Sequence, residues 1–340
     1  MATQHKYIRN IDLKISTEKA TYDFSKFKVV FQVIHASIST PKLLKCRIYN
    51  LSHGGRGTAN TIGDIQKAKN KNVVLQVWYN GGSPAVLFQG QIRMIYAGRE
   101  TPTETYLEIE ATYPPSSWTA TQVYNTVLPK KWTHEKVLQE TVGKTKGMKV
   151  GQLPQQKSNM NGARAKVIYQ NGRDMTREVG RNLSAFPVFD DNGNLNFISA
   201  QNPKSNGAPI KITPYNGMIG TPLQTPEGIQ VTALIDPSFK VGAVIDVYSM
   251  NGDDSRTAVQ QEEVELNYTG INSGNQYMDE YGNLQVKGLA HNGLYSILFV
   301  DHVGDTRGEA WYSTIIGQAL DGSDQAIMPT RAIEALGGGV

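Results

Sequence analysis

The chain has 340 residues, of which 39% are hydrophobic and 19% are charged, a balance typical of folded domains that excludes a largely disordered protein. No hydrophobic run approaches the roughly 20 residues that a membrane-spanning helix needs, and the first residues lack the apolar core of a signal peptide. Because Cys46 is the only cysteine, an internal disulfide is excluded, and we expect this side chain to be buried in a protein that folds in a reducing cytoplasm.

Charge is unevenly distributed along the chain. Residues 1–210 carry 28 Lys and Arg against 14 Asp and Glu, whereas residues 211–340 carry 6 against 16. The two parts therefore have net charges of +14 and −10, which favours head-to-tail contact with neighbours of opposite charge. Charges that only cover separate surfaces would explain the asymmetry equally well.

The first 113 residues have the pattern of a β domain. The stretches 28–35 and 106–111 alternate between hydrophobic and polar residues, the period of two that half-buried strands require. The Asn-Gly pair within residues 79–82 accepts positive φ and predicts a hairpin turn. Pro114 and Pro115 break the pattern, so we expect a first barrel-like domain over residues 1–113.

Residues 114–207 predict a small α+β insert. Thr133 is expected to cap a helix that runs to Val142, and Asp174 is expected to cap a second helix over residues 175–183. The turn residues 190–194 predict a hairpin between two short strands. The stretch 148–164, rich in Gln, Ser, Asn and Gly, predicts an exposed loop.

Residues 208–340 are strand-rich again and predict a second barrel-like domain with a C-terminal tail. Turns are expected at residues 251–254 and 281–283, a helical turn at 330–336, and a mobile or docking tail at 337–340.

A set of three strand patterns occurs twice, about 190 residues apart. The first set occupies residues 46–52, 73–78 and 88–98, and the second occupies residues 231–238, 242–248 and 293–304. Each set then turns through a short charged step that contains Thr into one more strand. Two like units in one chain can occupy two like positions around an axis, so three chains would offer six positions.

Several stretches contain residue types of calcium, phosphate or zinc sites but lack the rest of the pattern that such sites require. The stretch 190–194 is similar to part of a calcium loop but lacks the later bidentate Glu, so a hairpin turn is favoured, as it is at 251–254. The Gly-rich stretch 53–58 lacks the Gly-Lys-Ser/Thr ending of a phosphate loop. None of the six histidines forms a His-Glu-x-x-His pair. We therefore predict neither a metal nor a cofactor.

His302, with Asp301, Asp305 and Ser313, supplies the residue types of a hydrolytic triad. No Gly-x-Ser-x-Gly elbow exposes a serine, so a structural hydrogen bond at a strand end is favoured and no catalytic residue is predicted. The basic residues of the middle region lack interleaved aromatic residues, which favours a solvated or partner-facing surface over a nucleic-acid site. They are Lys130, Lys131, Lys144, Lys146 and Lys149.

Three stretches, in order, carry a family resemblance. The first contains Asn50, Leu51 and Ser52, the second Gly220, Pro222 and Pro237, and the third Tyr295, His302, Gly304, Asp305, Thr306 and Trp311. In this order they resemble the baseplate hub proteins of contractile phage tails, which are related to the tube-forming half of type VI secretion spike proteins. The order of the three stretches makes a chance match improbable.

The resemblance implies a mainly β protein with two similar barrel-like tube domains, which form a pseudo-six-fold ring as a homotrimer. Such a ring adapts the six-fold tail tube, which is built of the tail tube protein, to the three-fold central spike protein. It also contacts baseplate wedge proteins and lines a passage for DNA, without sequence-specific contacts to the DNA. Acidic residues of the C-terminal part are expected to keep DNA from sticking. The implied location is the virion tail baseplate, assembled in the host cytoplasm, and the implied role is structural and not enzymatic.

Two alternatives stay open. One is a carbohydrate-binding host-adhesion module, which needs exposed aromatic platforms; the aromatic residues Trp78, Tyr79, Trp311 and Tyr312 lie in strand runs instead. The other is a hub-associated cell-wall hydrolase that works through His302.

Overall fold

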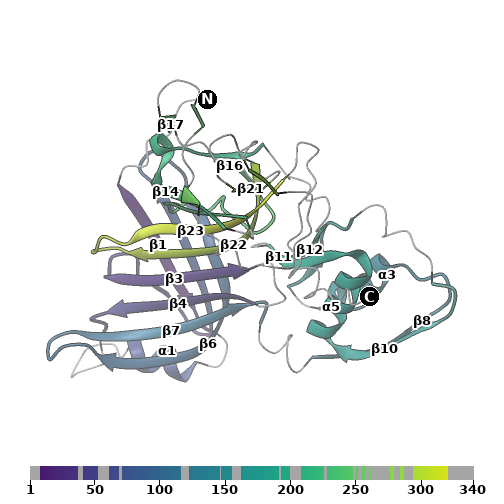
Figure 1. Cartoon of the computed structure of the whole chain (residues 1–340). Coiled ribbons are helices and arrows are strands. Elements are labelled where there is room, and N and C mark those ends of the chain that lie inside the picture. The colour runs from purple at the N-terminus through teal and green to yellow at the C-terminus, as the bar shows by residue number, and fades with distance from the viewer. Residues whose placement is uncertain are drawn as a thin grey trace.

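The structure is a computed structural model, shown in Figure 1. It describes residues 8–36, 41–52, 61–68, 71–115, 122–145, 147–154, 162–190, 193–199, 208–225, 228–247, 250–251, 255–256, 260–261, 276–278, 284–286 and 294–320. The turns expected at 251–254 and 281–283, the phosphate-loop candidate at 53–58, and the C-terminal segments expected at 330–340 lie wholly or mostly outside these residues.

The first strand unit supplies seven strands and one short helix. They are β1 (Arg9–Ser16), β2 (Thr21–Asp23), β3 (Val29–Ala36), β4 (Lys42–Tyr49), α1 (Thr61–Lys67), β5 (Asn72–Tyr79), β6 (Ala85–Arg99) and β7 (Thr105–Tyr113). The expected turn between β5 and β6 is confirmed, because Gly82 N–H donates to the Tyr79 carbonyl at 2.9 Å and Gly81 has a φ of 84°.

The insert follows. Its elements are β8 (Val123–Leu128), α3 (His134–Glu140), a 3₁₀ turn (Val142–Lys144), β9 (Lys149–Val150), β10 (Lys166–Asn171), α5 (Gly172–Leu183), β11 (Ala185–Phe189) and β12 (Asn194–Ser199). The second strand unit contains β13 (Ile210–Ile212), a 3₁₀ turn (Pro214–Asn216), β14 (Met218–Thr225), β15 (Gly228–Leu234), β16 (Val244–Val247), β17 (Met250–Asn251), β18 (Ser255–Arg256), β19 (Gln260–Gln261), β20 (Gln276–Met278), β21 (Leu284–Val286), β22 (Leu294–Asp305) and β23 (Trp311–Ala319).

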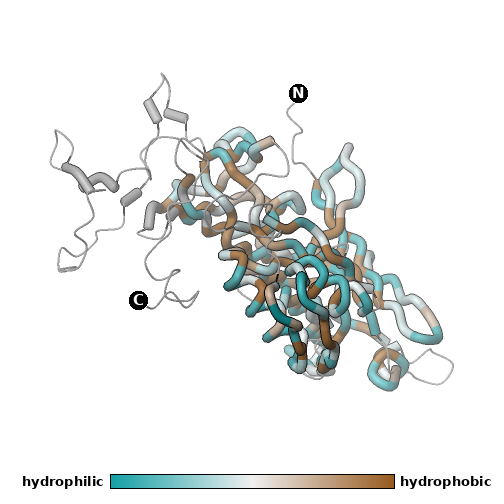
Figure 2. The backbone as a smooth tube through the Cα atoms, turned by 90° about the vertical axis from the view of Figure 1, so that its right-hand side faces the viewer, coloured by the Kyte–Doolittle hydropathy of each residue, from teal (hydrophilic) through white to brown (hydrophobic). Residues whose placement is uncertain are grey.

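The two strand units share one sheet. Among the described strands its order is β19-β14-β15-β23-β22-β3-β4-β7-β6-β5-β1-β2, with β13 and β16 joined at β22. Buried and less buried residues alternate along much of β3 and β4. Figure 2 shows hydrophobic and hydrophilic segments following each other closely along the backbone. The mainly β class predicted from the sequence is therefore correct.

The strand order of the first unit recurs in the second. β3, β4, β7, β6 and β5 are neighbours in that order, with antiparallel pairing throughout. β14, β15, β23, β22 and β16 repeat both the order and the direction. The long strands β6 and β22 each carry a register shift as well. The repeated strand pattern in the sequence is thus a repeated topology.

Three hydrophobic cores lie in the described part of the chain. The first core packs residues of β1 to β7 together with Ile235 and Trp311, the second packs the insert, and the third packs β13 to β16 against β22 and β23. Figure 1 shows the insert beside the main sheet, with β8 and β10 on its far side. The division into domains at residues 113 and 207 stays a prediction.

Two expectations for the insert are corrected by the structure. The second helix begins three residues earlier than expected, because Asn171 and not Asp174 is its N-cap: the Asn171 side chain accepts from the Asp174 N–H at 2.8 Å. The stretch 148–164 is not wholly a loop, since β9 pairs in parallel with β12. By contrast, the Thr133 cap is confirmed, although its helix ends at Glu140, and so is the hairpin of β11 and β12.

The described residues include no helix that is both long and apolar enough to span a membrane.

Candidate functional site

The third motif lies where the two strand units meet. β22 pairs with β23 on one edge; on its other edge it pairs first with β16, at residues 294–296, and then with β3, at residues 299–305. We call the pairing of β22 with β3 the seam. Because β22 takes part in both units, the contacts along the seam decide whether the two units move as one body.

His302 is buried in the seam and pairs with a serine. It lies between Val33 on β3 and Ser313 on β23, and its Nδ1 atom is 2.7 Å from Ser313 Oγ. Val33 belongs to the first core, and Ala233, the next residue across the sheet, belongs to the third. The side chains of His302 and Ser313, 3% and 0% exposed, therefore satisfy each other between two apolar cores.

The same geometry does not assemble a hydrolytic triad. Side chains alternate along this part of β22, so Asp301 and Asp305 lie on the face opposite His302. Asp301 accepts a hydrogen bond from Gln32 Nε2 at 2.9 Å, and burial raises its pKa. Ser313 is fully buried and is not accessible to a substrate. These contacts favour the structural reading of His302, and the absence of enzymatic activity stays a prediction.

Gly304 lets two aromatic rings meet across the seam. A Cβ atom at this position would lie 2.3 Å from Phe31 Cζ, because the Phe31 ring covers the glycine. On the other side of Gly304, Trp311 meets the Phe31 ring edge to face, with centroids 5.6 Å apart. The glycine is thus required by close packing and not by a turn.

Trp311 is also the start of a hydrogen-bond relay. Its Nε1–H donates to the Tyr79 hydroxyl at 3.1 Å, and that hydroxyl donates to the Ile235 carbonyl at 2.9 Å. Burial raises the pKa of Tyr79 to about 12, so the phenol stays protonated and can donate. The relay joins the ends of β23, β5 and β15.

The Asp-Thr step after β22 holds the end of the seam. Thr306 N–H donates to the Val29 carbonyl at 3.0 Å, and Thr306 Oγ1 accepts from the Val29 N–H at 2.9 Å. Asp305 Oδ1 accepts from the Arg307 N–H at 2.8 Å and shapes the turn. Each residue therefore has a structural role that the motif alone did not reveal.

The first motif lies on the same rim of the sheet, two strands away. Asn50 adopts a φ of 57° directly after β4, donates to the Thr105 carbonyl at 2.8 Å, and accepts from the Thr105 N–H at 3.2 Å. Leu51 is buried in the first core. The Ser52 carbonyl accepts a hydrogen bond from the N–H of Ile62, which lies in the first turn of α1. This motif ends β4 and connects it to the first turn of α1 by a hydrogen bond.

The remaining motif residues shape local backbone or fill a core elsewhere. Gly220, with a φ of 71°, and Pro222 occupy the irregular part of β14, where a proline does not interrupt the ladder. Pro237 is the second residue of a turn that Phe239 N–H closes on the Asp236 carbonyl at 3.1 Å. Tyr295 is buried at the opposite end of β22, which raises its pKa to about 12.

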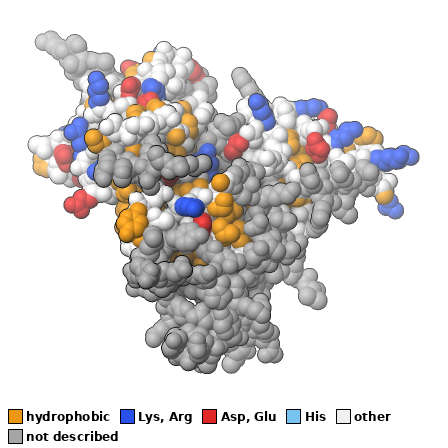
Figure 3. Space-filling view, turned by 90° about the horizontal axis from the view of Figure 1, so that it is seen from above, with side chains coloured by type: hydrophobic (Ala, Val, Ile, Leu, Met, Phe, Trp, Pro, Cys, Tyr) orange, Lys and Arg blue, Asp and Glu red, His pale blue; other side chains and the backbone are white. Residues whose placement is uncertain are grey.

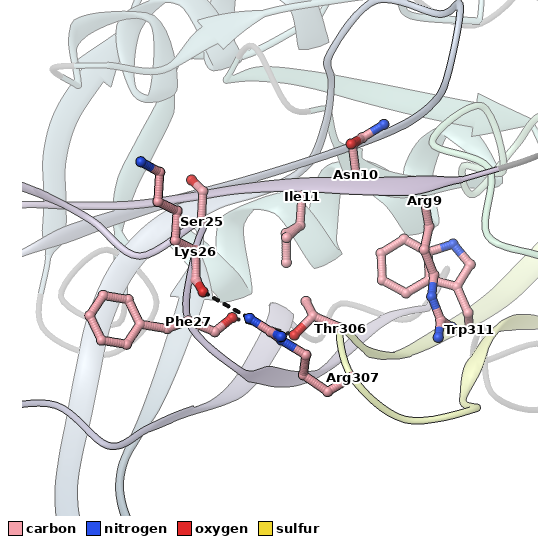
Figure 4. Close-up of a pocket in the computed structure, with 9 residues that line it drawn as sticks. All are labelled: Arg9, Asn10, Ile11, Ser25, Lys26, Phe27, Thr306, Arg307 and Trp311. Carbon is pink, nitrogen blue, oxygen red and sulfur yellow. Dashed lines mark hydrogen bonds between the residues drawn. The ribbon is translucent and has the colours of Figure 1, made fainter.

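A pocket of about 330 Å³ opens at the rim beside the seam (Figure 4). Its lining comes from both strand units and consists of Arg9, Asn10, Ile11, Ser25, Lys26, Phe27, Thr306, Arg307 and Trp311. Arg9 lies over the Trp311 ring, 5.3 Å from the centroid. Thr306, Arg307 and Trp311 belong to the closing motif, whereas the participation of Arg9 was not predicted, because no sequence signal links residue 9 to residue 311.

The insert presents an exposed apolar strand face. Val127 pairs with Val167, and the two side chains are 62% and 69% exposed; Val123 and Tyr169 on the same outer face are 53% and 75% exposed. Exposed apolar clusters of this kind commonly mark contact surfaces. Lys and Arg side chains surround this end of the insert in Figure 3.

The predicted basic group is only partly a free surface. Lys144 forms an ion pair with Glu140, whereas Lys130, Lys131 and Lys149 are exposed; Lys146 lies outside the described residues. Within the described residues, no group of three His, Cys, Asp or Glu could hold a metal ion.

No protein-family model matches the sequence, and no curated protein matches it. Solved structures do. The tail protein from Neisseria meningitidis MC58 is 6% identical and has a TM-score of 0.55, with 91% of this chain and 96% of that chain covered. The 43 kDa tail protein of prophage MuSo2 from Shewanella oneidensis is 8% identical and has a TM-score of 0.56, with 94% and 100% covered.

A third similar structure is the E. coli c3393 protein, described as a component of the type VI secretion system that is structurally similar to the T4 bacteriophage tail proteins gp27 and gp5. It is 11% identical and has a TM-score of 0.55, with 93% of this chain and 79% of that chain covered. At such identities the likeness concerns the fold. The resemblance stated from the motifs is confirmed at that level: this chain has the fold of phage tail proteins and of a type VI secretion component.

Proposed function

We propose that this protein is a structural ring component of a phage tail or tail-like particle, a homotrimeric baseplate hub between the tail tube and the central spike. The shared fold and the repeated strand order support this proposal. The observation that carries it is the seam, since one of two equivalent junctions is formed within the chain and the other is unpaired among the described strands.

The repeat defines which strands the open junction would use. β22 corresponds to β6, and β3 corresponds to β14, because each pair occupies the same place in the repeated strand order. Within one chain, β22 of the second unit pairs with β3 of the first. The corresponding contact would join β6 of one copy to β14 of the next.

Both strands have available edges. From Arg93 to Arg99, β6 pairs with β7 on one edge, while no described strand pairs with the other. Met94 and Tyr96 on this part of β6 are 39% and 47% exposed. On β14, Ile219 is 42% exposed, and the described pairing with β19 involves only residues 223 and 224. Open edges with exposed apolar side chains are the usual sites of strand addition.

A contact between unlike edges is heterologous and closes into a ring when its rotation allows. Three copies would supply six like units, which matches a six-fold tube on one side and a three-fold spike on the other. In this arrangement DNA passes through the ring without sequence-specific contacts, and the acidic C-terminal third supplies part of the lumen charge. The apolar outer face of β8 and β10 would then contact wedge or tail tube partners.

Disulfide cross-linking tests the β6–β14 contact. Cys46 is buried, and burial raises its thiol pKa, so engineered cysteines will react without interference from it. The repeat places Ile219 opposite Glu100, as Val30 lies opposite Asp305 in the seam. The double variant Glu100→Cys/Ile219→Cys should therefore form covalent trimers under mild oxidation. The uncross-linked protein alone should have three times the 37.4 kDa chain mass by light scattering, or three copies should be present in its complex with the spike partner.

The matched control is Tyr169→Cys/Ile219→Cys, because Tyr169 is exposed but lies on the insert. This control should stay uncross-linked. A double variant at residues 100 and 219 that remains uncross-linked after oxidation, in a protein that is a single copy both alone and in complex with the spike partner, would contradict the ring.

A further inference from the structure

The rim pocket contains two arginines whose charge is not neutralised within the described residues. Arg9 Nη2–H donates to the Gly308 carbonyl, and Arg307 Nη2–H donates to the Lys26 carbonyl at 3.3 Å. Each contact orients a guanidinium group through one of its five N–H donors and leaves the charge and the other donors available. In the described part of the chain, no carboxylate forms an ion pair with either arginine. We infer that this pocket binds a carboxylate-bearing, extended segment of a different protein.

The pocket wall suits a peptide side chain with apolar neighbours. Figure 4 shows the Arg9 side chain next to the Trp311 ring on one side of the pocket and the Phe27 ring on the other, with Ile11 above Arg307 and Thr306. A guanidinium group on an aromatic face is held flat and can present two parallel donors to a carboxylate. A free inorganic anion would gain nothing from the aromatic and aliphatic groups.

One edge of β1 can accept an added strand. Asn80 N–H donates to the Ile8 carbonyl. The main-chain N–H and C=O groups of even-numbered residues of β1 therefore point toward β5, and those of odd-numbered residues point toward the opposite edge. On that second edge, the Leu13 carbonyl accepts from the Phe24 N–H, and the Leu13 N–H donates to Ser25 Oγ. The main-chain groups of Ile11 have no partner among the described residues. An extended peptide can therefore add backbone hydrogen bonds beside the arginines.

The other end of the pocket carries two carboxylates and two lysines, so the positive charge of the arginines does not continue along it. Ser25 Oγ–H is within hydrogen-bond distance of Asp12, at 3.1 Å, and of Asp23, at 2.5 Å. Asp12 also forms an ion pair with Lys14, so a run of phosphates that entered at the arginines would find no continuous positive track beyond Ser25. A peptide with one or two acidic side chains does not need such a track.

The location favours a different protein over a second copy. Arg9 and Trp311 begin β1 and β23, Phe27 precedes β3, and Thr306 follows β22, so the pocket lies at strand ends. The open edges proposed to join copies are on β6 and β14 instead. The pocket therefore faces whatever stacks on this rim, and the inference does not require the ring to be a trimer.

Calorimetric titration of the full chain tests the inference. The probe is acetyl-Glu-Val-Glu-Leu-amide, and the comparison probes are acetyl-Gln-Val-Gln-Leu-amide, inorganic phosphate and a single-stranded DNA dodecamer. We expect the acidic peptide to bind with a Kd below about 1 mM and at least tenfold more tightly than each comparison probe. Arg307→Gln, an exposed position, should weaken peptide binding about tenfold.

Arg181→Gln removes an exposed arginine of the insert and is the matched control; it should leave binding unchanged. Arg9→Lys keeps the charge but loses the paired donors, so it should also weaken binding. Peptide binding that Arg307→Gln does not change would overturn the inference, as would phosphate or DNA binding as tight as the peptide. Loss of self-association in Arg307→Gln would assign the pocket to a second copy and would overturn the proposed occupant, whereas a wild-type chain of single-chain mass that still binds the peptide would contradict only the ring.

Discussion

At the scale of single residues, the closing motif is explained by packing and hydrogen bonds at the seam. Gly304 leaves space for the Phe31 ring, and Thr306 Oγ1 accepts a hydrogen bond from the Val29 N–H. The buried side chains of His302 and Ser313 form a hydrogen bond with each other. None of these roles requires a reaction. The motif is therefore consistent with a structural protein in which the seam must form correctly.

Gly304→Ala tests the close approach. The added Cβ would overlap the Phe31 ring, which Trp311 holds from the other side, so we expect unfolding by urea to show a loss of about 1–3 kcal/mol. Gly143→Ala is the control, because the nearest atom to its Cβ is 3.7 Å away, and it should change stability little. Adding Phe31→Leu to Gly304→Ala should recover part of the loss; equal losses in the two single glycine variants would contradict this account.

The buried tyrosines predict a loss of stability at high pH. Burial raises the pKa of Tyr295 to about 12, above the value near 10 of an unfolded chain. The protonated Tyr295 therefore contributes fully to the free energy of unfolding below pH 10. This contribution, at most about 2–3 kcal/mol, is lost as the pH rises from 10 toward 12. Tyr295→Phe should flatten that part of the pH dependence in urea unfolding, and an unchanged slope would show that Tyr295 does not cause it.

At the scale of elements, hydrogen bonds at a helix start decide which of two possible cap residues is used. Two cap-forming residues, Asn171 and Asp174, compete for the start of α5, and the structure assigns the cap to Asn171 because its side chain reaches a main-chain N–H. The carboxylate of Asp174 lies in the first turn, where it favours the helix dipole and accepts from Asn171 Nδ2–H at 2.8 Å.

Thermal unfolding can distinguish the two roles. Asn171→Ala should destabilise the insert by about 1 kcal/mol, because it leaves a helix N–H without its cap. Asp174→Ala should cost less, about 0.3–1 kcal/mol, because it removes only a dipole contact and one side-chain hydrogen bond. The reverse order of the two losses would mean that Asp174 is the effective cap.

At the scale of the whole molecule, β22 makes the two strand units depend on each other. It pairs with β16 of one unit and with β3 of the other, while the insert has its own core. We therefore expect the first and third cores to unfold together and the insert to unfold separately.

Hydrogen exchange with mass spectrometry can measure this coupling. Phe31→Leu should lower protection on both sides of the seam, in β4 of the first unit and in β15 of the second, because both depend on one sheet. Leu195→Ala, in the core of the insert, should lower protection mainly in α3 and α5. A Phe31→Leu variant that loses protection only in the first unit would show that the seam does not couple the two units.

The sequence by itself determined what depends on local pattern and local chemistry. Alternation predicted the strands, the Asn-Gly pair predicted the turn before β6, and Thr133 predicted the start of α3, since each signal lies within a few residues. The repeated strand pattern and the ordered motifs also indicated the fold class. The register of the repeat, by contrast, could not be read from the spacing, because the connections in the two units differ in length.

Only the tertiary structure decided which distant residues meet. Arg9 and Trp311 share a pocket, His302 and Ser313 lie opposite each other, and β22 continues the sheet of the first unit. Such contacts depend on strand order and register across nearly 300 residues, and a side chain carries no local signal of its cross-strand partner. For the same reason, the edge of β6 that no described strand covers gains its meaning only from the internal pairing of β22 with β3, which shows what an equivalent strand does.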